Sequence, residues 1–371
     1  DIEAHRRMVF DEVRNRAYAE AIDEAVFPGC RVLDLGAGLG IHGLLAAAAG
    51  AQEVILLDAS PVVELAEDIA SANGLSDRIS IVRNRVEEAE LDASVDVLIS
   101  VFTGNFLLTE DLLPSLFIAR DRFLKSGGTV LPGRARMWAS LVQAQNYHED
   151  RIECWSEQAQ GLGFDPSRSL AANRVHYSDA KTIGAEPLTV PAQLMELDFG
   201  SARSAACSSR VVLKVAQAGT CHGILGWFDI QLGERWLSTG PDAEPTHWSL
   251  AFLPLDPPLE LKNGDAVDLE LDRPEFGEWT WTVSCGDVRQ RHSTFHSKRV
   301  DLEFLRRQKE DYVPSLGAEG EMALYVLRQM EQGKSVAGIL SAVQTNFPQQ
   351  SERDPGLRYR VRNLIERWAG K

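Results

Sequence analysis

The sequence predicts a Rossmann-like α/β domain, then a β-rich domain and a small helical region, behind a leading helix in residues 1–26. Three observations lead to this fold class. Apolar runs alternate with helical stretches over residues 27–132, as in a doubly wound parallel sheet. Stretches with a two-residue apolar period, separated by Pro, Gly and Asp, fill residues 133–297. Helical periodicity returns in residues 298–371.

The first elements follow from local patterns. Residues 5–26 carry apolar side chains at roughly helical spacing and end before a Pro-Gly pair, so they predict one amphipathic helix. RVLDLGAGLG predicts a strand with a glycine-rich turn, and EVILLDAS predicts a second strand after an alanine-rich helix. The remaining expected elements are a helix at 61–73, the strands ISIVRN and VDVLIS, and a helix at 110–124. Because strands and helices alternate, the sheet should be mostly parallel.

The β-rich region is typical of a β-barrel or a sandwich. Its two-residue periods occur in RMWASLVQ, RVVLKVAQ, GILGWFDIQL, AVDLELDR and EWTWTVSCG. Residues 148–180 are more helical, and we expect them to protrude from the barrel. The last region has three helical segments with breaks at Gly333 and Pro348, which predicts a small helical or winged-helix-like unit.

Charge and composition exclude several classes of protein. The formal net charge of −16 argues against general binding to phosphate backbones, which needs clustered Lys and Arg. Residues 298–371 differ, with 13 Lys and Arg against 10 Asp and Glu. Four arginines of the last helix form a basic face: Arg358, Arg360, Arg362 and Arg367. We interpret this face as a solvated or protein-docking surface, with nucleic-acid binding as the alternative.

Neither a membrane segment nor a metal site is expected. No apolar run approaches the ~20 residues that span a bilayer, and the chain begins DIEAHRRM, so we predict a soluble cytoplasmic protein. The five cysteines are scattered without a CxxC pair, which suggests reduced thiols rather than disulfides or zinc.

A glycine-rich turn marks the candidate cofactor site. Gly36, Gly38 and Gly40 follow the first strand, where missing side chains let the backbone approach a ligand. Because Gly38, Gly40 and Gly43 also fit GxGxxG, a nicotinamide or flavin cofactor has to be considered. Asp34, within the strand before the first glycine, favours S-adenosylmethionine instead, because this placement is typical of class I methyltransferases.

Two acidic residues further along the chain fit the same cofactor. Asp58 ends the second strand, where a carboxylate can accept both ribose hydroxyl protons. A helix N-cap before Ser60 is the plainer alternative for Asp58. Glu87 follows the third strand and could bind the adenine amino group, or could be a solvated acid.

The sequence resembles the protein arginine methyltransferases from His5 to about Gly286. The shared segments are HRRMVFDEVR, DLGAGLGIHGLLAAAAGAQEV, RVEEAEL, SVFTGNFLLTED, LPGRARM and the triplet THW at 246–248, which is the most specific. The resemblance implies a cofactor domain, a β-barrel interrupted by a helical dimerisation arm, and an antiparallel ring homodimer. We therefore expect a protein, peptide or small-molecule methyl acceptor.

The resemblance also implies roles for single residues. It assigns Arg14 to the methionine carboxylate of the cofactor, which a guanidinium can bind with two donors. It pairs His247 with Asp11, and it places Met8 near the transferred methyl group. It further suggests that His5 and Val86 contact the cofactor. Without the resemblance, Arg14 would be interpreted as a solvent-facing helix residue.

The loop SVFTGNFLLTED departs from the family pattern. The family has two glutamates nine positions apart; the second is Glu110 here, but the first is Val101. Burying a guanidinium with one carboxylate missing costs roughly 3 kcal/mol or more. The pocket residues expected from the loop and the THW triplet are Val101, Thr103, Asn105 and Trp248.

Three interpretations of this loop stay open. Asp111 or Glu3 could replace the missing carboxylate. Alternatively, the acceptor is less cationic, with Glu110 as the only carboxylate and with Thr103 and Asn105 as neutral hydrogen-bonding groups. Or the protein is an inactive cofactor-binding dimer with a regulatory or scaffolding role. We favour an active transferase with an altered acceptor.

Overall fold

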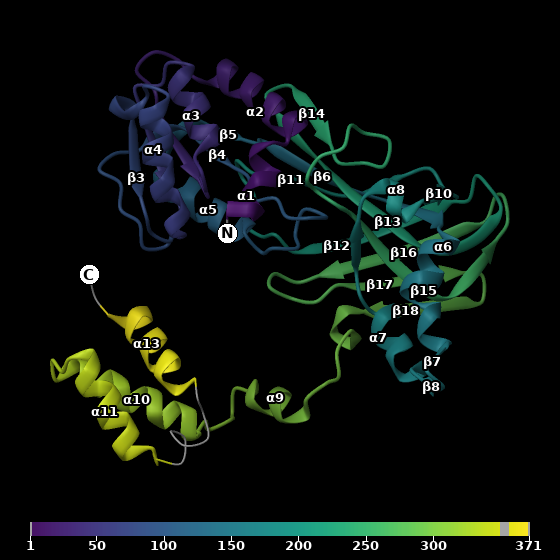
Figure 1. Ribbon diagram of the computed structural model, residues 1–371. Helices are drawn as coiled ribbons and strands as arrows, with labels where there is room; N and C mark the ends of the chain where they lie inside the picture. The colour runs from purple at the N-terminus through teal and green to yellow at the C-terminus, as the bar shows by residue number, and fades with distance from the viewer. Residues whose placement is uncertain (1, 349–355, 370–371) are drawn as a thin grey trace. The chain divides into compact units, whose positions relative to one another are not determined.

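The computed structural model describes residues 2–348 and 356–369 of the chain. The chain divides into two compact units, residues 1–299 and residues 300–371, and each is considered by itself (Figure 1). None of the described helices is long and apolar enough to cross a bilayer. Within the described ranges, no group of three or more His, Cys, Asp or Glu side chains is arranged to hold a metal ion.

The first unit begins with a five-stranded, wholly parallel sheet in the order β3-β2-β1-β4-β5. Its strands are β1 (Arg31–Leu35), β2 (Glu53–Leu57), β3 (Ile79–Val82), β4 (Val95–Ser100) and β5 (Leu124–Leu131). The strand order reverses between β1 and β4, and in such sheets ligands bind outside the carboxyl ends of the strands at this reversal. The sheet confirms the predicted Rossmann-like fold class.

The leading segment differs from the single predicted helix. It forms α1 (Ile2–Val9) and α2 (Glu12–Ala25), separated at residues 10 and 11. Asp11 is the N-cap of α2, because its side chain accepts a hydrogen bond from the backbone N–H of Arg14. A capping aspartate starts a new helix, and apolar periodicity alone cannot detect such a break.

The other helices of this region are α3 (Ile41–Ala48), α4 (Leu65–Ala72) and α5 (Leu113–Phe123), with the 3-10 turns η1 (Pro61–Glu64) and η2 (Ser76–Arg78). The helix predicted at 61–73 is divided between η1 and α4. The predicted helix at 110–124 starts late because Asp111 has a φ of 54°, which an α-helix does not allow. The start of α3 has Gly40 at φ 79°, where glycine has no steric penalty.

Two antiparallel sheets form the β-rich part of the first unit, which is not a closed barrel. The larger contains β6 (Arg134–Gln143), β9 (His176–Ser178), β10 (Glu186–Pro187), β11 (Ala192–Asp198), β13 (Gly219–Leu232), β14 (Arg235–Ser238) and β15 (Leu250–Leu261). The smaller contains β12 (Cys207–Lys214), β16 (Ala266–Arg273), β17 (Thr280–Cys285) and β18 (Val288–Ser293). Their apolar sides join the parallel sheet in one core cluster.

The interruption predicted at 148–180 contains short elements. They are α6 (Gln145–Arg151), a hairpin of β7 (Gln158–Ala159) and β8 (Leu162–Gly163), α7 (Arg168–Ala172), and α8 (Ala180–Ile183) after β9. Three 3-10 turns complete this part of the unit: η3 (Glu153–Ser156) and η4 (Asp165–Ser167) lie inside the segment, and η5 (Thr294–His296) follows β18.

The second unit is helical. Its helices are α9 (Leu302–Arg307), α10 (Ala318–Glu331), α11 (Val336–Asn346) and α13 (Leu357–Trp368), and the last three share a small apolar core. No strand occurs in the described part of residues 300–371, so the winged-helix-like alternative lacks its wing there. Arg360 of the predicted basic face binds Glu319 at 2.6 Å, whereas Arg358, Arg362 and Arg367 are exposed.

Candidate cofactor and acceptor site

A cavity of about 470 Å³ lies at the carboxyl ends of the parallel strands, next to α1 and α2. Ten of the predicted site residues line it: His5, Met8, Arg14, Gly36, Gly38, Asp58, Val86, Glu87, Val101 and Glu110. Seven others do not: Asp11, Asp34, Gly40, Thr103, Asn105, His247 and Trp248. The cavity therefore joins the expected cofactor residues to one end of the acceptor loop.

The glycine-rich turn is in close contact with its neighbours, so a side chain at Gly36 would not fit. Gly36 has a φ of 72°, and a Cβ there would lie 2.1 Å from the Phe102 ring. Gly38 donates its N–H to Asp58 Oδ2 at 2.8 Å, and Ser60 donates to Asp58 Oδ1 at 2.7 Å. Asp58 thus orders the turn and also lines the cavity, whereas the N-cap of η1 is Ser60, whose side chain accepts from the N–H of Val62.

Asp34 and Gly40 lie behind this turn. Asp34 is buried and accepts a hydrogen bond from the N–H of Gly43 at 2.8 Å, which ties the first strand to the start of α3. Burial raises the pKa of Asp34 to about 7. A Cβ on Gly40 would lie 2.9 Å from Leu56. Both residues shape the turn from outside the cavity lining.

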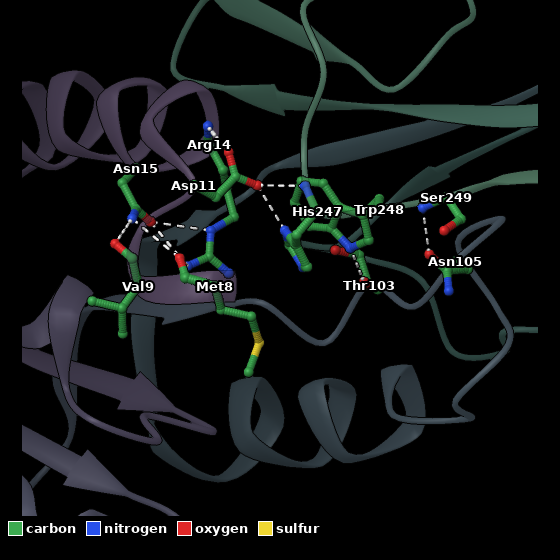
Figure 2. A network of polar contacts seen from close by, with 10 residues as sticks. All are labelled: Met8, Val9, Asp11, Arg14, Asn15, Thr103, Asn105, His247, Trp248 and Ser249. Atoms are coloured by element: carbon green, nitrogen blue, oxygen red, sulfur yellow. Dashed lines mark hydrogen bonds and ion pairs between the residues drawn. The ribbon is translucent and has the colours of Figure 1, made fainter. Parts of the chain in front are cut away.

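Arg14 projects its guanidinium from α2 into the cavity wall (Figure 2). Its Nη2 donates to the carbonyl of Met8 at 2.5 Å, and Nε and Nη2 both donate to Asn15 Oδ1. Nη1 makes no hydrogen bond to another described residue. Burial lowers the pKa of Arg14 from its usual value, but an arginine remains charged at neutral pH.

Asp11 and His247 form the predicted pair, 236 residues apart (Figure 2). The backbone N–H and Nδ1 of His247 lie 2.8 Å and 2.7 Å from Asp11 Oδ2. Burial raises the pKa of Asp11, but the hydrogen bonds from His247 and Arg14 outweigh it and keep this pKa below its usual value. The pair lines a neighbouring groove of about 780 Å³, and it fastens the break between α1 and α2 to the β-rich part.

The middle of the acceptor loop, residues 101–112, is attached to the β-rich part. Trp248 donates from Nε1 to the carbonyl of Thr103 at 2.8 Å, and Ser249 donates its N–H to Asn105 Oδ1 at 2.8 Å. These contacts anchor the loop, and Thr103, Asn105 and Trp248 do not line the cavity. Trp248 lines the neighbouring groove, and the Thr103 hydroxyl is buried without a partner, so the pocket role predicted for these three residues stays a prediction.

The end of the loop is attached more strongly. Arg273 donates from Nη1 and Nη2 to the two carboxylate oxygens of Asp111, at 2.8 Å and 2.7 Å. The N–H of Phe276 also donates to Asp111. Glu3 accepts a hydrogen bond from Arg6 at 2.7 Å on exposed α1. The interpretation in which Asp111 replaces the missing glutamate does not fit this geometry, and Glu110 is the loop carboxylate that lines the cavity.

Sequence patterns did not single out several residues of this site. Asn15 holds both Arg14 and the end of α1, since its Nδ2 donates to the carbonyl of Val9 at 2.7 Å. Ser115 donates to Glu87 at 2.9 Å, and the cavity is also lined by Phe102 and His42. The sequence places only Asn15 next to Arg14. The other contacts join separate elements, so the sequence does not indicate them.

Similarity to known proteins agrees with this geometry. Residues 32–128 match the methyltransferase domain family, and residues 133–275 match the arginine methyltransferase oligomerization subdomain. Protein arginine N-methyltransferase 1 of Oryza sativa subsp. japonica is 32% identical over 273 residues, covering 71% of this chain and 70% of the relative. Protein arginine N-methyltransferase 6 of Xenopus laevis is 30% identical over 310 residues, covering 79% and 86%.

A solved structure also resembles this chain. The Trypanosoma brucei PRMT1 enzyme-prozyme heterotetrameric complex with AdoHcy superposes with a TM-score of 0.72 at 26% identity, covering 79% of this chain and 98% of that chain. Arabidopsis thaliana protein arginine methyltransferase 10, at 23% identity and a TM-score of 0.68, shares the fold.

Proposed function

The chain belongs to the protein arginine methyltransferase family and uses S-adenosylmethionine as its methyl donor, and we propose that its acceptor is a nucleophile less cationic than guanidinium. The predicted family, fold class and donor are thereby confirmed. One observation supports the altered acceptor: the cavity lining contains Val101 where the family has a glutamate, and Asp111 is bound to Arg273. A guanidinium there would lack one of its two carboxylates, which costs about 3 kcal/mol or more.

The cavity wall has groups that fit S-adenosylmethionine. Gly36 and Gly38 carry no side chains of their own, His5 and Phe102 next to them also line the cavity, and Arg14 Nη1 is available for a carboxylate. We propose that Asp58 binds the ribose hydroxyls, and that Glu87 binds the adenine amino group. The further donor contacts in this proposal are His5, Val86 and the turn shaped by Asp34 and Gly40.

The proposed reaction is a direct displacement, for which the donor supplies an electrophilic methyl group on a sulfonium. Glu110 accepts a hydrogen bond from the acceptor and stabilises the positive charge that develops there. The acceptor proton then leaves through Glu110 to water or to the Asp11–His247 pair. Met8 packs beside the methyl position and limits the space for further methyl groups.

Substitution of Val101 tests the acceptor proposal. We expect Val101→Glu to raise the rate of methyl transfer from labelled S-adenosylmethionine to an arginine-containing peptide by roughly tenfold or more. Val101→Gln has the same size without the charge and serves as the matched control. Wild-type protein should label another component of a pool of proteins, peptides and small molecules. Equal arginine methylation by wild type and Val101→Glu would contradict the proposal.

A regulatory role is the second candidate. The solved relative from Trypanosoma brucei is described as an enzyme-prozyme complex, and a single loop carboxylate is also consistent with a weak or inactive partner subunit. In that case wild type and Val101→Glu would bind S-adenosylhomocysteine, yet neither would transfer a label. Cofactor binding without transfer therefore separates a regulatory partner from an enzyme with an unknown acceptor.

The assembly and the domain limits are further parts of the proposal. The chain carries the oligomerisation subdomain of the family. We propose that it forms a homodimer through the arm at 148–180, with domains at 27–132, 133–297 and 298–371. Light scattering after size exclusion tests the dimer, since a monomer at micromolar concentration would contradict it. The cytoplasmic location stays a prediction.

A further inference from the structure

A histidine in the cavity wall has no role in the proposed function so far. His42 is the second residue of α3, lines the cavity together with Arg14, and has an exposed fraction of only 3%. Its ring packs against the Tyr18 ring with centroids 4.4 Å apart. The Tyr18 hydroxyl donates to the carbonyl of Ser100 at 2.9 Å, at the end of β4. The imidazole is therefore held in place between two helices and the sheet edge.

The nitrogens of this ring lack hydrogen-bond partners. Nε2 is fully buried without a partner, and no hydrogen bond joins Nδ1 to any residue that the structure describes. Burial lowers the pKa of His42 well below its usual range, and the nearby Arg14 cation lowers it further. The ring is thus a neutral imidazole with one donor and one acceptor. A buried polar group without a partner is rare in folded proteins and calls for an explanation.

We propose that His42 is a further binding residue for the amino-acid end of the methyl donor. Arg14 lies on α2 four residues before Tyr18, so the His42 ring and the free Nη1 of Arg14 belong to the same part of the wall. The amino-acid end carries both a carboxylate and an ammonium group, so either tautomer of the ring finds a partner there. The ribose and adenine are assigned to Asp58 and Glu87, which leaves the amino-acid end for His42.

This inference rests on the proposed function only in that the methyl donor is S-adenosylmethionine. Two ligands that differ at the amino-acid end test the contact with His42. S-adenosylhomocysteine has the amino-acid end, whereas 5′-methylthioadenosine lacks it. By isothermal titration calorimetry, we expect His42→Leu to weaken S-adenosylhomocysteine binding about tenfold and to leave 5′-methylthioadenosine binding unchanged. His42→Gln keeps an N–H donor and a carbonyl acceptor, so it should retain most of the affinity.

The ligand-free protein provides a second measurement. His42→Leu removes an unsatisfied polar group, so its thermal midpoint without ligand should equal or exceed that of wild type while its affinity falls. Equal losses of affinity for both ligands, or no loss for either, would overturn the role of His42 and leave the donor assignment intact. Failure of wild type to bind S-adenosylhomocysteine would instead overturn the donor assignment, and this inference with it.

Discussion

The polar groups of the acceptor loop differ in their hydrogen bonding from those of the donor wall, which is the part of the cavity wall, including Arg14 and His42, that is proposed to bind the methyl donor. On the donor wall, Arg14 Nη1 and the His42 ring have no partner among the described residues, although both side chains are buried. In the acceptor loop, the polar groups of Asn105 and Asp111 are bound to the β-rich part. The donor wall is thus prepared to bind a polar ligand, whereas the side chains of Asn105 and Asp111 hold the loop itself; the Thr103 hydroxyl of the loop is buried without a partner.

This contrast explains why one substitution changes the acceptor site so strongly. The loop contains three non-glycine residues at positive φ, Phe106, Leu107 and Asp111, so its conformation has to be stabilised by its surroundings. The ring of Phe106 stacks on Trp279 at 5.0 Å, which adds an apolar anchor to the polar ones. In a loop attached in this way, Asp111 is held by Arg273, and Glu110 is the loop carboxylate in the cavity lining.

Breaking the Asp111–Arg273 pair should have the largest effect. Arg273 is 5% exposed, so Asp111→Asn leaves a buried cation with only weak partners and should lower the free energy of unfolding by about 3 kcal/mol. Asn tolerates the positive φ at this position, which keeps the backbone comparable. Urea unfolding followed by circular dichroism measures the loss.

A matched control exists on α5. Asp121 pairs with the equally buried Arg120, but Asp121 is half exposed and Arg120 also binds two backbone carbonyls, so Asp121→Asn should cost less than about 1 kcal/mol. S-adenosylhomocysteine affinity of the Asp111→Asn protein should stay within about threefold of wild type, because neither Asp111 nor Arg273 lines the cavity. A large loss of S-adenosylhomocysteine affinity would show that the donor wall and the acceptor loop are coupled, and it would contradict the distinction between them.

Removing the guanidinium of Arg14 tests the donor wall. Arg14→Met should weaken S-adenosylhomocysteine binding by roughly 100-fold, because a buried charge-assisted pair contributes about 2–5 kcal/mol when one partner is truncated. Binding of 5′-methylthioadenosine, which has no carboxylate, should change far less in the same titration. Arg16→Met, on the exposed side of α2, is the control and should leave both affinities unchanged. Similar losses for the two ligands would mean that Arg14 acts only through Met8 and Asn15.

The donor wall was more predictable from sequence than the loop. Gly36 and Gly38 were found because a tight turn after a strand requires residues without side chains, which is a local demand. The break at Asp11 was missed because its cap is recognisable only once the helix start is known. Nothing in the sequence marked His42, since a single histidine in an alanine-rich helix is typical of an ordinary core position.

The surroundings of the loop residues could not be read from the sequence, for a physical reason. Asn105 has a side chain suited to binding a ligand, but its Oδ1 accepts from the N–H of Ser249, and Trp248 holds the backbone carbonyl of Thr103, about 145 residues away in the chain. Similarly, the spacing of Asp111 from Glu110 suggested a replacement carboxylate, and Arg273 of β16 decides otherwise. Contacts between distant elements set these roles, and local patterns do not carry that information.

Asp34, which lies behind the lining of the cavity, gives an effect that depends on pH. Burial raises its folded-state pKa to about 7, above the usual value near 4, so the folded protein holds a proton that the unfolded chain releases. Stability from this group is therefore full below about pH 4 and falls as the pH rises toward 7. Asp34→Asn cannot ionise and can still accept from Gly43, so it should be more stable than wild type by a few kcal/mol at pH 8, about 1.4 kcal/mol per unit of pKa shift, and equal to it at pH 4. Urea unfolding of both proteins across this range measures the difference, and a gap that stays constant with pH would show that Asp34 is ionised in the folded protein throughout.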